Sequence, residues 1–373
     1  MLDRAKLVQE IEKVAGLLFV DRSASYDIAR NAWQQLCQDA TFVYKVAQVT
    51  DAPWPLPTWQ GRADEIISIE PMQQPYMICS VDGSQIYPDR HQAQYGCFLI
   101  NIGGVLLAYK QPQLKKAVQF FSTPHIFPTH DEPITTEGVN CLRHELELQY
   151  GYDWTITHTA DNAPHMVVFD GSLIFWHLEA QHGLKERFLQ SYFLQLLRAA
   201  EKQLMMCGYI SGPKSKELVH LLRLYLCNFK PENSERYEAV NHLTDVAIVR
   251  MFLPQYHRTT IFKNNSNISS LYPASVHPYF FYLHVGAEIG RVEIPAWIAH
   301  QEKLVNTIAA IIIDQSLKGN GYPIVLAEAH EQAVVKMHDR EFFYHYLQKI
   351  SMHYNQRLSA DSYKLQRKIR MGI

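Results

Sequence analysis

Two short segments with the same three residues could perform metal chemistry. Asp-Gly-Ser occurs at Asp82–Ser84 and again at Asp170–Ser172, each time directly after an apolar run. An ionised carboxylate at the edge of a core is costly unless it is paired or bound to a cation. Two such carboxylates repel each other until a cation lies between them, and hard divalent ions prefer oxygen ligands. The pair predicts a divalent metal site, and the alternative is two ordinary Asp-Gly turns.

The segment between these motifs adds Arg143, Glu145 and Glu147 on an expected helix. Glutamates on helices are usually solvated, but a helix that leads into the Asp170 strand can bring one glutamate over the end of that strand. Glu145 and Glu147 are two positions apart and point in roughly opposite directions. Only one of them can be a ligand, and the residues alone leave both open.

A third segment holds Tyr322, Pro323 and His330. An imidazole beside two aspartates makes a mixed nitrogen and oxygen site, which suits manganese better than calcium. Tyr322 is a candidate to hydrogen-bond a phosphate oxygen or the attacking water. The alternatives are a tyrosine packed beside Pro323 and a histidine with a structural role.

The elements that must position these residues follow from periodicity and turn residues. Apolar residues at helical spacing, such as Leu7, Ile11, Val14 and Leu18, predict helices in residues 1–50. Strands are expected at 76–82 and 166–170, and a hairpin at 95–102 and 105–109 around Gly103-Gly104. Further hairpin strands are expected at 279–285 and 291–294, and a short strand at 324–326. Helices are expected at 137–150, 174–207, 217–226, 241–252, 303–317 and, as a basic surface helix, 363–370. Strands and helices in this order predict an α/β domain with a mixed sheet.

Composition excludes several classes of protein. The 373 residues carry a formal charge of −2, unlike a protein that coats DNA through charge alone. The same low charge predicts weak DNA affinity in the isolated protein. Neither Gly-rich nucleotide motif occurs, no stretch is long and apolar enough to span a bilayer, and the charged N-terminus does not read as a secretion signal. The six cysteines form no C-x-x-C pair, which fits a reducing cytoplasm.

Several motifs taken together resemble the NurA nuclease family, especially its cyanobacterial-type members. They are the two Asp-Gly-Ser segments, the Tyr322 to His330 run, Leu243-Thr-Asp245, Arg258-Thr259 and the stretch His284–Trp297. The resemblance covers roughly residues 76–345. It implies an RNase H-like mixed sheet flanked by helices, with helical insertions. It also implies a homodimer that degrades DNA with Mn²⁺ or Mg²⁺ and works with the hexameric HerA translocase.

The resemblance carries over to individual residues. Asp82 and Asp170 correspond to the two metal-binding strand aspartates, and the family pattern R-x-x-x-E selects Arg143 and Glu147, leaving Glu145 as the alternative. Tyr322 and His330 keep the family spacing, so the expected catalytic set includes both, with His330 as a further metal ligand. Asp245 falls on another acidic position of the family. Candidate DNA-phosphate contacts are Arg143, Arg258 and Arg291.

The expected function is a metal-dependent deoxyribonuclease with one or two ions. Its expected type is a 5'–3' exonuclease and single-strand endonuclease in DNA end resection and double-strand break repair. The expected organisation is a helical region and linker at 1–60, a nuclease domain at 61–350 and a basic helix at 351–373. One rival is an inactive module that docks a DNA translocase through exposed residues such as Leu18 and Phe19. The other is a nuclease of the RNase H or resolvase kind acting on other substrates.

Overall fold

The computed structural model describes residues 2–19, 21–49, 52–88, 96–109, 116–129, 134–158, 163–178 and 182–354. The basic helix expected at 363–370 lies outside these residues. None of the described helices combines the length and apolar character that crossing a bilayer requires.

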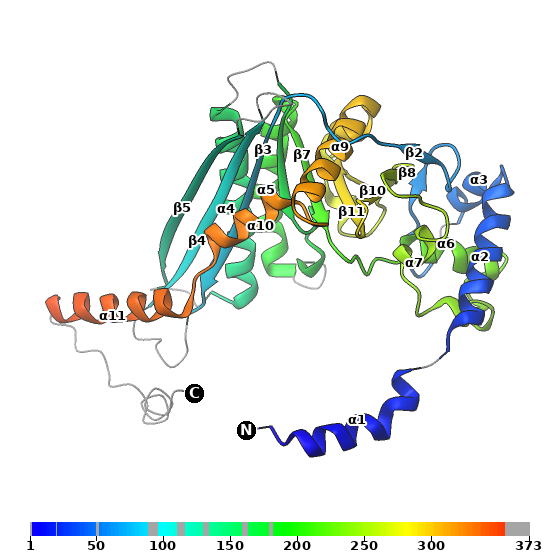
Figure 1. Cartoon of the computed structure of the whole chain (residues 1–373), viewed down its shortest axis with the longest axis horizontal. Coiled ribbons are helices and arrows are strands. Elements are labelled where there is room, and N and C mark those ends of the chain that lie inside the picture. The colour runs from blue at the N-terminus through cyan, green and yellow to red at the C-terminus, as the bar shows by residue number, and fades with distance from the viewer. Residues whose placement is uncertain are drawn as a thin grey trace.

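A single mixed sheet runs through the molecule (Figure 1). Its strands are β1 (Thr58–Trp59), β2 (Ile66–Ser68), β3 (Tyr76–Ile86), β4 (Cys97–Tyr109), β5 (Lys116–Pro128), β6 (His165–Asp170), β7 (Met205–Ile210), β8 (His257–Thr259), β9 (Phe262–Lys263), β10 (Pro278–His284) and β11 (Ile289–Pro295). The order is β1-β9-β10-β11-β7-β6-β3-β4-β5, and the short strands β2 and β8 pair beside β10.

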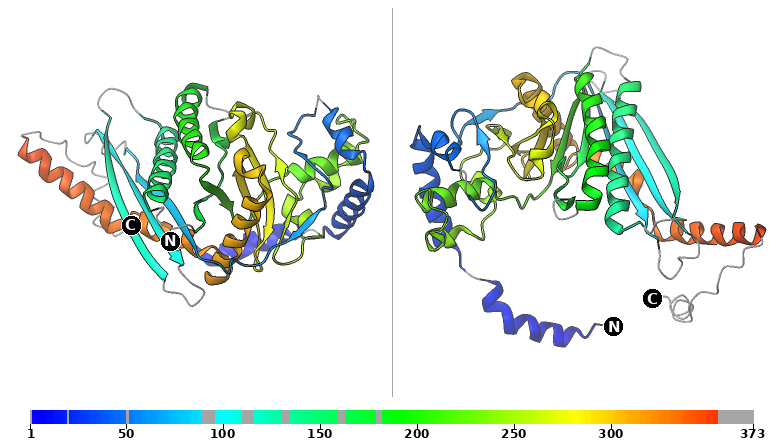
Figure 2. Two further views of the ribbon diagram at one scale, coloured as in Figure 1. Left: turned by 90° about the horizontal axis from the view of Figure 1, so that it is seen from above. Right: turned by 180° about the vertical axis from the view of Figure 1, so that it is seen from behind.

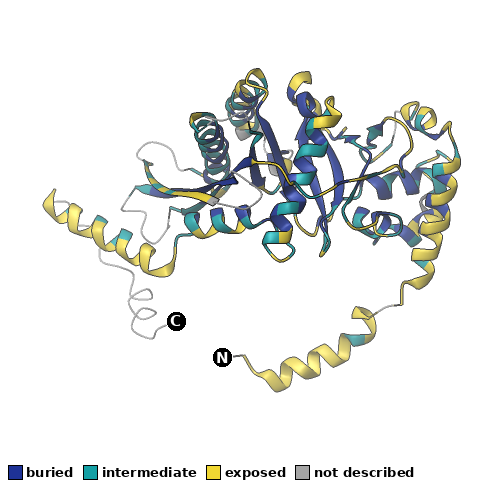
Figure 3. Ribbon diagram, turned by 45° about the horizontal axis from the view of Figure 1, so that its top comes forward, coloured by how far each residue is buried: buried dark blue, intermediate teal, exposed yellow. Residues whose placement is uncertain are grey.

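Helices cover both faces of this sheet. The α-helices of the described residues are α1 (Arg4–Leu18), α2 (Ser23–Gln38), α3 (Phe42–Ala47), α4 (Thr136–Thr157), α5 (His182–Glu201), α6 (Glu217–Leu226), α7 (Asp245–Val249), α8 (Ala296–Ala299), α9 (Glu302–Lys318), α10 (Ile324–Ala333) and α11 (Met337–His353). Figure 2 shows α4 and α5 on one face, with α9 and α10 on the other. The outermost helices α1 and α11 have no buried residue (Figure 3).

Strand directions identify the type of fold. The strands β3, β4 and β5 are successive antiparallel neighbours, and β6 and then β7 continue the sheet parallel to β3 on its other side. Three antiparallel strands followed by two parallel strands, in the order β5-β4-β3-β6-β7, make an RNase H-like sheet. The expected fold class is therefore confirmed, with β8 to β11 and the helices around them as additions.

The strand β10 separates two hydrophobic cores because its side chains alternate between the faces of the sheet. Phe281 and Leu283 belong to the main core, while Phe280 and Tyr282 belong to a second core. Residues from α2, α3 and α6 fill this second core. The second core thus contains residues from both sides of the boundary expected at residue 60, since N-terminal and central helices share it.

The hairpin expected around Gly103-Gly104 is wrong, because β4 runs straight through both glycines. A Cβ at Gly103 would lie 2.3 Å from the backbone nitrogen of Ala333 in α10. The glycine permits close packing of a helix on a strand instead of forming a turn.

Two further expectations are wrong for related reasons. The helix expected at 174–207 ends early, and Met205–Ile210 form the central strand β7, whose residues 205–209 are buried. The strand expected at 324–326 is the first turn of α10. Short apolar runs fit either a buried strand or a buried helix, so periodicity alone could not separate the two. The strand at 166–170, the helix at 217–226 and the second hairpin are confirmed.

Candidate active site

Two neighbouring parallel strands bring the Asp-Gly-Ser aspartates together. The ladder between β3 and β6 pairs Ser80 with Val168, and each aspartate lies two residues farther along its strand. Asp82 and Asp170 therefore occupy equivalent positions on adjacent strands. Asp170 is exposed at the end of β6, while the side chain of Asp82 is 19% exposed.

The helix α4 supplies a third carboxylate. Glu147 is buried, and its Oε1 lies 3.1 Å from Nη1 of Arg143, one turn earlier. The same Nη1 lies 3.8 Å from Oδ1 of Asp82. Glu145 points elsewhere, because it accepts a hydrogen bond from the hydroxyl of Ser191 on α5. Of the two glutamates, the structure thus places Glu147 beside the aspartates.

The helix α10 brings in His330 from the opposite face. Its Nδ1 lies 2.9 Å from Oδ2 of Asp82, while the other oxygen of Asp82 accepts the backbone N–H of Gly83 at 2.7 Å. Ser84 fixes the end of the helix, since its hydroxyl donates to the carbonyl of Ala333 at 2.5 Å. The first Asp-Gly-Ser segment therefore carries an acid and also holds the helix of its histidine partner.

Tyr322, just before α10, reaches the second aspartate. Its hydroxyl donates a hydrogen bond to Asp170, and burial together with this carboxylate raises the pKa of Tyr322. The pKa of Asp170 is also raised: its carboxyl is desolvated and the charges of Asp82 and Glu147 repel it, although the Tyr322 hydroxyl and His330 act in the opposite direction. The charges of Asp82 and Glu147 are thus close enough to raise the pKa of Asp170.

The donor set has the chemistry of a site for a hard divalent ion. It contains three carboxylates and an imidazole, and the buried Oε1 of Glu147 has no hydrogen-bond donor. A bound cation relieves the repulsion between such carboxylates and the cost of desolvating their charge. As the side chains stand, no three His, Cys, Asp or Glu side chains among the described residues are arranged to hold an ion. Protein partners hold the carboxylates instead, chiefly Arg143 and His330.

Asp245 lies outside this cluster, so its expectation as an acidic site residue is corrected. Its carboxylate is fully buried and accepts the backbone N–H groups of Leu218 and Val219 at the start of α6, and the Tyr282 hydroxyl at 2.7 Å. This is the pattern of a helix N-cap. The role is structural.

The expectation of DNA-phosphate contacts at Arg258 and Arg291 is also corrected. Both side chains are almost fully buried. Arg258 pairs with Glu302, and Arg291 pairs with Glu217 at 2.8 Å and Glu293 at 2.9 Å. A buried guanidinium that is already paired with carboxylates is not available to a phosphate group. Of the three candidate arginines, only Arg143 lies at the acidic cluster.

The sequence interpretation missed His144. Its Nδ1 lies 2.9 Å from Oε2 of Glu147, and its Nε2 lies 3.2 Å from Nη2 of Arg143. The signal was present, because residues three apart on a helix are neighbours on its surface. The imidazole orients the third carboxylate.

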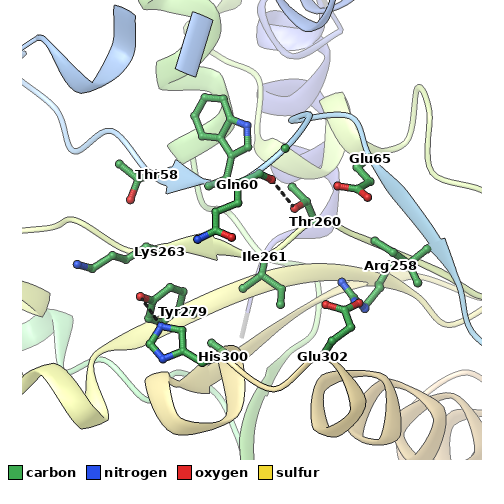
Figure 4. A pocket seen from close by; sticks show the side chains of 14 residues that line it. Thr58, Gln60, Glu65, Arg258, Thr260, Ile261, Lys263, Tyr279, His300 and Glu302 are labelled. Carbon is green, nitrogen blue, oxygen red and sulfur yellow. Dashed lines mark hydrogen bonds and ion pairs between the residues drawn. The ribbon is translucent and has the colours of Figure 1, made fainter. Parts of the chain in front are cut away.

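A separate cavity of about 770 Å³ lies between the β1–β2 segment and β8 to β10 (Figure 4). Its lining includes Lys263, His300, Tyr279 and the Arg258–Glu302 ion pair. None of the clustered acids lines this cavity. The candidate active site is the acidic cluster of Asp82, Glu147 and Asp170, where the end of β6 lies beside the middle of β3.

The family model of the NurA domain matches residues 77–335, more than half of the chain. No curated protein matches.

Two solved structures show distant likeness. One is LC9-RNase H1, a type 1 RNase H with the type 2 active-site motif, at 11% identity and a TM-score of 0.22, covering 41% of this chain and 71% of the other. The other is Kluyveromyces polysporus Argonaute with a guide RNA, at 10% identity and a TM-score of 0.22, covering 69% and 25%. The fold assignment does not depend on these likenesses; it follows from the order and directions of the strands.

Proposed function

The chain belongs to the NurA domain family of nucleases, and from this premise we propose that it is a metal-dependent deoxyribonuclease. One observation carries the proposal: Asp82 and Asp170 occupy equivalent positions on adjacent parallel strands, and Glu147 and His330 approach them from opposite faces of the sheet. Acids that converge from separate parts of the chain are typical of phosphodiester hydrolysis with divalent ions.

Asp82, Glu147 and Asp170, with His330, would hold one or two Mn²⁺ or Mg²⁺ ions. Bound there, the ions would supply Lewis acidity for activation of water and for the leaving oxygen of the phosphodiester.

The protein's own groups have distinct tasks in this proposal. His144 orients Glu147, and Tyr322 orients Asp170 through its hydroxyl. Arg143 is the candidate contact to a DNA phosphate, because a guanidinium matches phosphate geometry. Asp82 is held by the backbone of Gly83 on one oxygen and by His330 on the other.

The proposed biological role is DNA end resection in double-strand break repair, in the cytoplasm, by 5'–3' exonuclease and single-strand endonuclease activity. We propose a homodimer with a HerA-type hexameric translocase as partner. The near-neutral charge of the chain supports a need for assembly, since phosphate binding depends on clustered cations. Exposed apolar side chains at the C-terminal end of α1 and directly after it support a docking surface: Leu17, Leu18 and Phe19 are 80%, 60% and 80% exposed.

The test uses end-labelled single-stranded and duplex DNA with Mn²⁺ or Mg²⁺. Asp82→Asn, Glu147→Gln and Asp170→Asn should each lower cleavage by more than about 100-fold, because loss of a mere supporting partner at a metal site already costs up to about that factor. The matched control is Glu145→Gln, which keeps the oxygen that accepts the Ser191 hydrogen bond and should cleave like the unaltered protein. Unchanged cleavage by the Asp82 or Asp170 variant would refute the proposed active site.

A further inference from the structure

We propose that Arg143 is a built-in counter-cation of the acidic cluster, which competes with a divalent ion for Asp82 and Glu147. The inference rests on the proposed function, because it concerns ion binding at the same cluster. It adds a regulatory element: an ion binds only when the guanidinium gives up its position.

The position of the guanidinium is the first argument. Nη1 of Arg143 lies 3.1 Å from Oε1 of Glu147 and 3.8 Å from Oδ1 of Asp82, and it donates a hydrogen bond of 2.9 Å to the carbonyl of Gly83. A single nitrogen thus lies between two carboxylates from different elements. That is the place where a cation relieves their repulsion.

The sequence of β3 accommodates this side chain. A Cβ at position 83 would lie 2.6 Å from Cγ of Arg143 and 2.7 Å from Oε1 of Glu147. Any larger residue at Gly83 would therefore push both side chains away from the strand. The glycine of the first Asp-Gly-Ser segment serves the close approach of the Arg143–Glu147 pair.

The contact is electrostatic and incomplete, which makes it replaceable. Oε1 of Glu147 and Nε of Arg143 are buried without a hydrogen-bond partner, although Oε1 is close to the charge. Among the described residues, Arg143 is the only arginine or lysine that forms an ion pair with Asp82 or Glu147. With Asp170, the cluster contains three carboxylates. The single positive charge of Arg143 balances one of the three carboxylates, and the other close partners of Asp82 and Glu147 are the imidazoles of His330 and His144. A divalent ion would compensate more of the negative charge than the guanidinium does.

The Arg143 side chain is partly open to solvent. The Arg143 side chain is 21% exposed, so the guanidinium can turn toward solvent without crossing the core. By contrast, Arg291 is 2% exposed and enclosed by its two carboxylates. Only the first of these arginines can leave its partners at modest cost.

The experiment measures Mn²⁺ affinity of the full chain by isothermal titration calorimetry, with electron paramagnetic resonance of free Mn²⁺ as a second readout. Arg143→Gln should bind Mn²⁺ about tenfold more tightly than the unaltered protein, a difference of about 1.4 kcal/mol. The matched control is Arg30→Gln, which removes an exposed arginine that also pairs with an acid on its own helix. The Mn²⁺ affinity of Arg30→Gln should equal that of the unaltered protein.

Arg143→Lys is a second variant that retains the charge. Its ammonium lacks the planar fork of donors, so its Mn²⁺ affinity should lie between those of the unaltered protein and Arg143→Gln. If Arg143 only supports the structure of the site, both variants should bind Mn²⁺ more weakly. Equal or weaker binding by Arg143→Gln would therefore overturn the inference.

The failure of the inference differs from the failure of the proposed function. If the unaltered protein binds Mn²⁺, Asp82→Asn does not, and Arg143→Gln binds no more tightly, then only the competition is refuted. If neither the unaltered protein nor Arg143→Gln binds Mn²⁺, the proposed metal site is refuted and the competition with it.

Discussion

Two clusters in this molecule contain the same types of side chain but differ in what the protein leaves available. The acidic cluster consists of Asp82, Glu147, Asp170, Arg143 and Tyr322. The buried ionic cluster consists of Glu217, Asp245, Glu293, Arg291 and Tyr282. Each has three acids, an arginine and a tyrosine whose hydroxyl donates to an aspartate.

The carboxylates of the buried ionic cluster all have donors within the protein. Arg291 pairs with Glu217 and Glu293, and Glu293 also accepts the Ser172 hydroxyl at 2.7 Å and the Leu173 N–H at 2.9 Å. Through Glu293, the buried ionic cluster therefore holds the second Asp-Gly-Ser segment in place. In the acidic cluster, Asp170 is exposed and a buried oxygen of Glu147 lacks a donor, and the side chain of His330, which contacts Asp82 from outside the cluster, is 59% exposed. Residue types do not separate structure from function here; the burial of the side chains and the completed pairing of the carboxylates do.

Replacing the arginine of each cluster should give the largest difference in stability between the two clusters. Arg291→Met leaves two buried carboxylates unpaired and should lower the free energy of unfolding by about 3–5 kcal/mol. Arg143→Met should lower it by less, about 1–3 kcal/mol, because the Arg143 side chain is 21% exposed and the imidazoles of His144 and His330 still contact Glu147 and Asp82. Urea denaturation of both variants measures the difference. Equal losses would contradict the distinction between the clusters.

Replacing the tyrosine of each cluster should distinguish the clusters through smaller changes. Tyr282→Phe leaves the buried Asp245 without one of its donors and should cost about 1–3 kcal/mol of stability. Tyr322→Phe should change stability little but lower DNA cleavage by about 10–100-fold, because it removes the group that orients Asp170. Denaturation and cleavage are measured on both variants. A Tyr322 variant with full activity would assign that residue to packing.

The smallest expected effect concerns pH. Burial and the nearby Glu217 carboxylate raise the pKa of Asp245 in the folded protein. As pH rises, the unfolded chain loses this proton at a lower pH than the folded protein does. Stability therefore falls as pH rises from the ordinary pKa of about 3.9 through the raised pKa of the folded protein.

Asp245→Asn removes this titration and keeps an oxygen for the N–H groups of α6. Comparison of urea midpoints from about pH 4 to about pH 8 should show the unaltered protein losing stability relative to the variant. A difference that does not change with pH would show that Asp245 keeps its ordinary pKa.

The two Asp-Gly-Ser segments show how far local sequence leads. Both were expected to end strands, and the second does, since β6 ends at Asp170. The first lies inside β3, which continues to Ile86. Its glycine accommodates Arg143 and Glu147, and its serine holds α10. The same residues perform different tasks because their surroundings come from distant parts of the chain.

The sequence by itself determined the strands at the two aspartates, several helices and the family, and it supplied the candidates for the acidic cluster while leaving both Glu145 and Glu147 open. These rest on short-range periodicity, on turn residues and on motif spacing, which adjacent residues encode. Only the tertiary structure decided that β7 is a strand, that Gly103 contacts a helix, and that Asp245, Arg258 and Arg291 are buried. Those outcomes depend on packing between residues far apart in sequence, where burial overrides local preference.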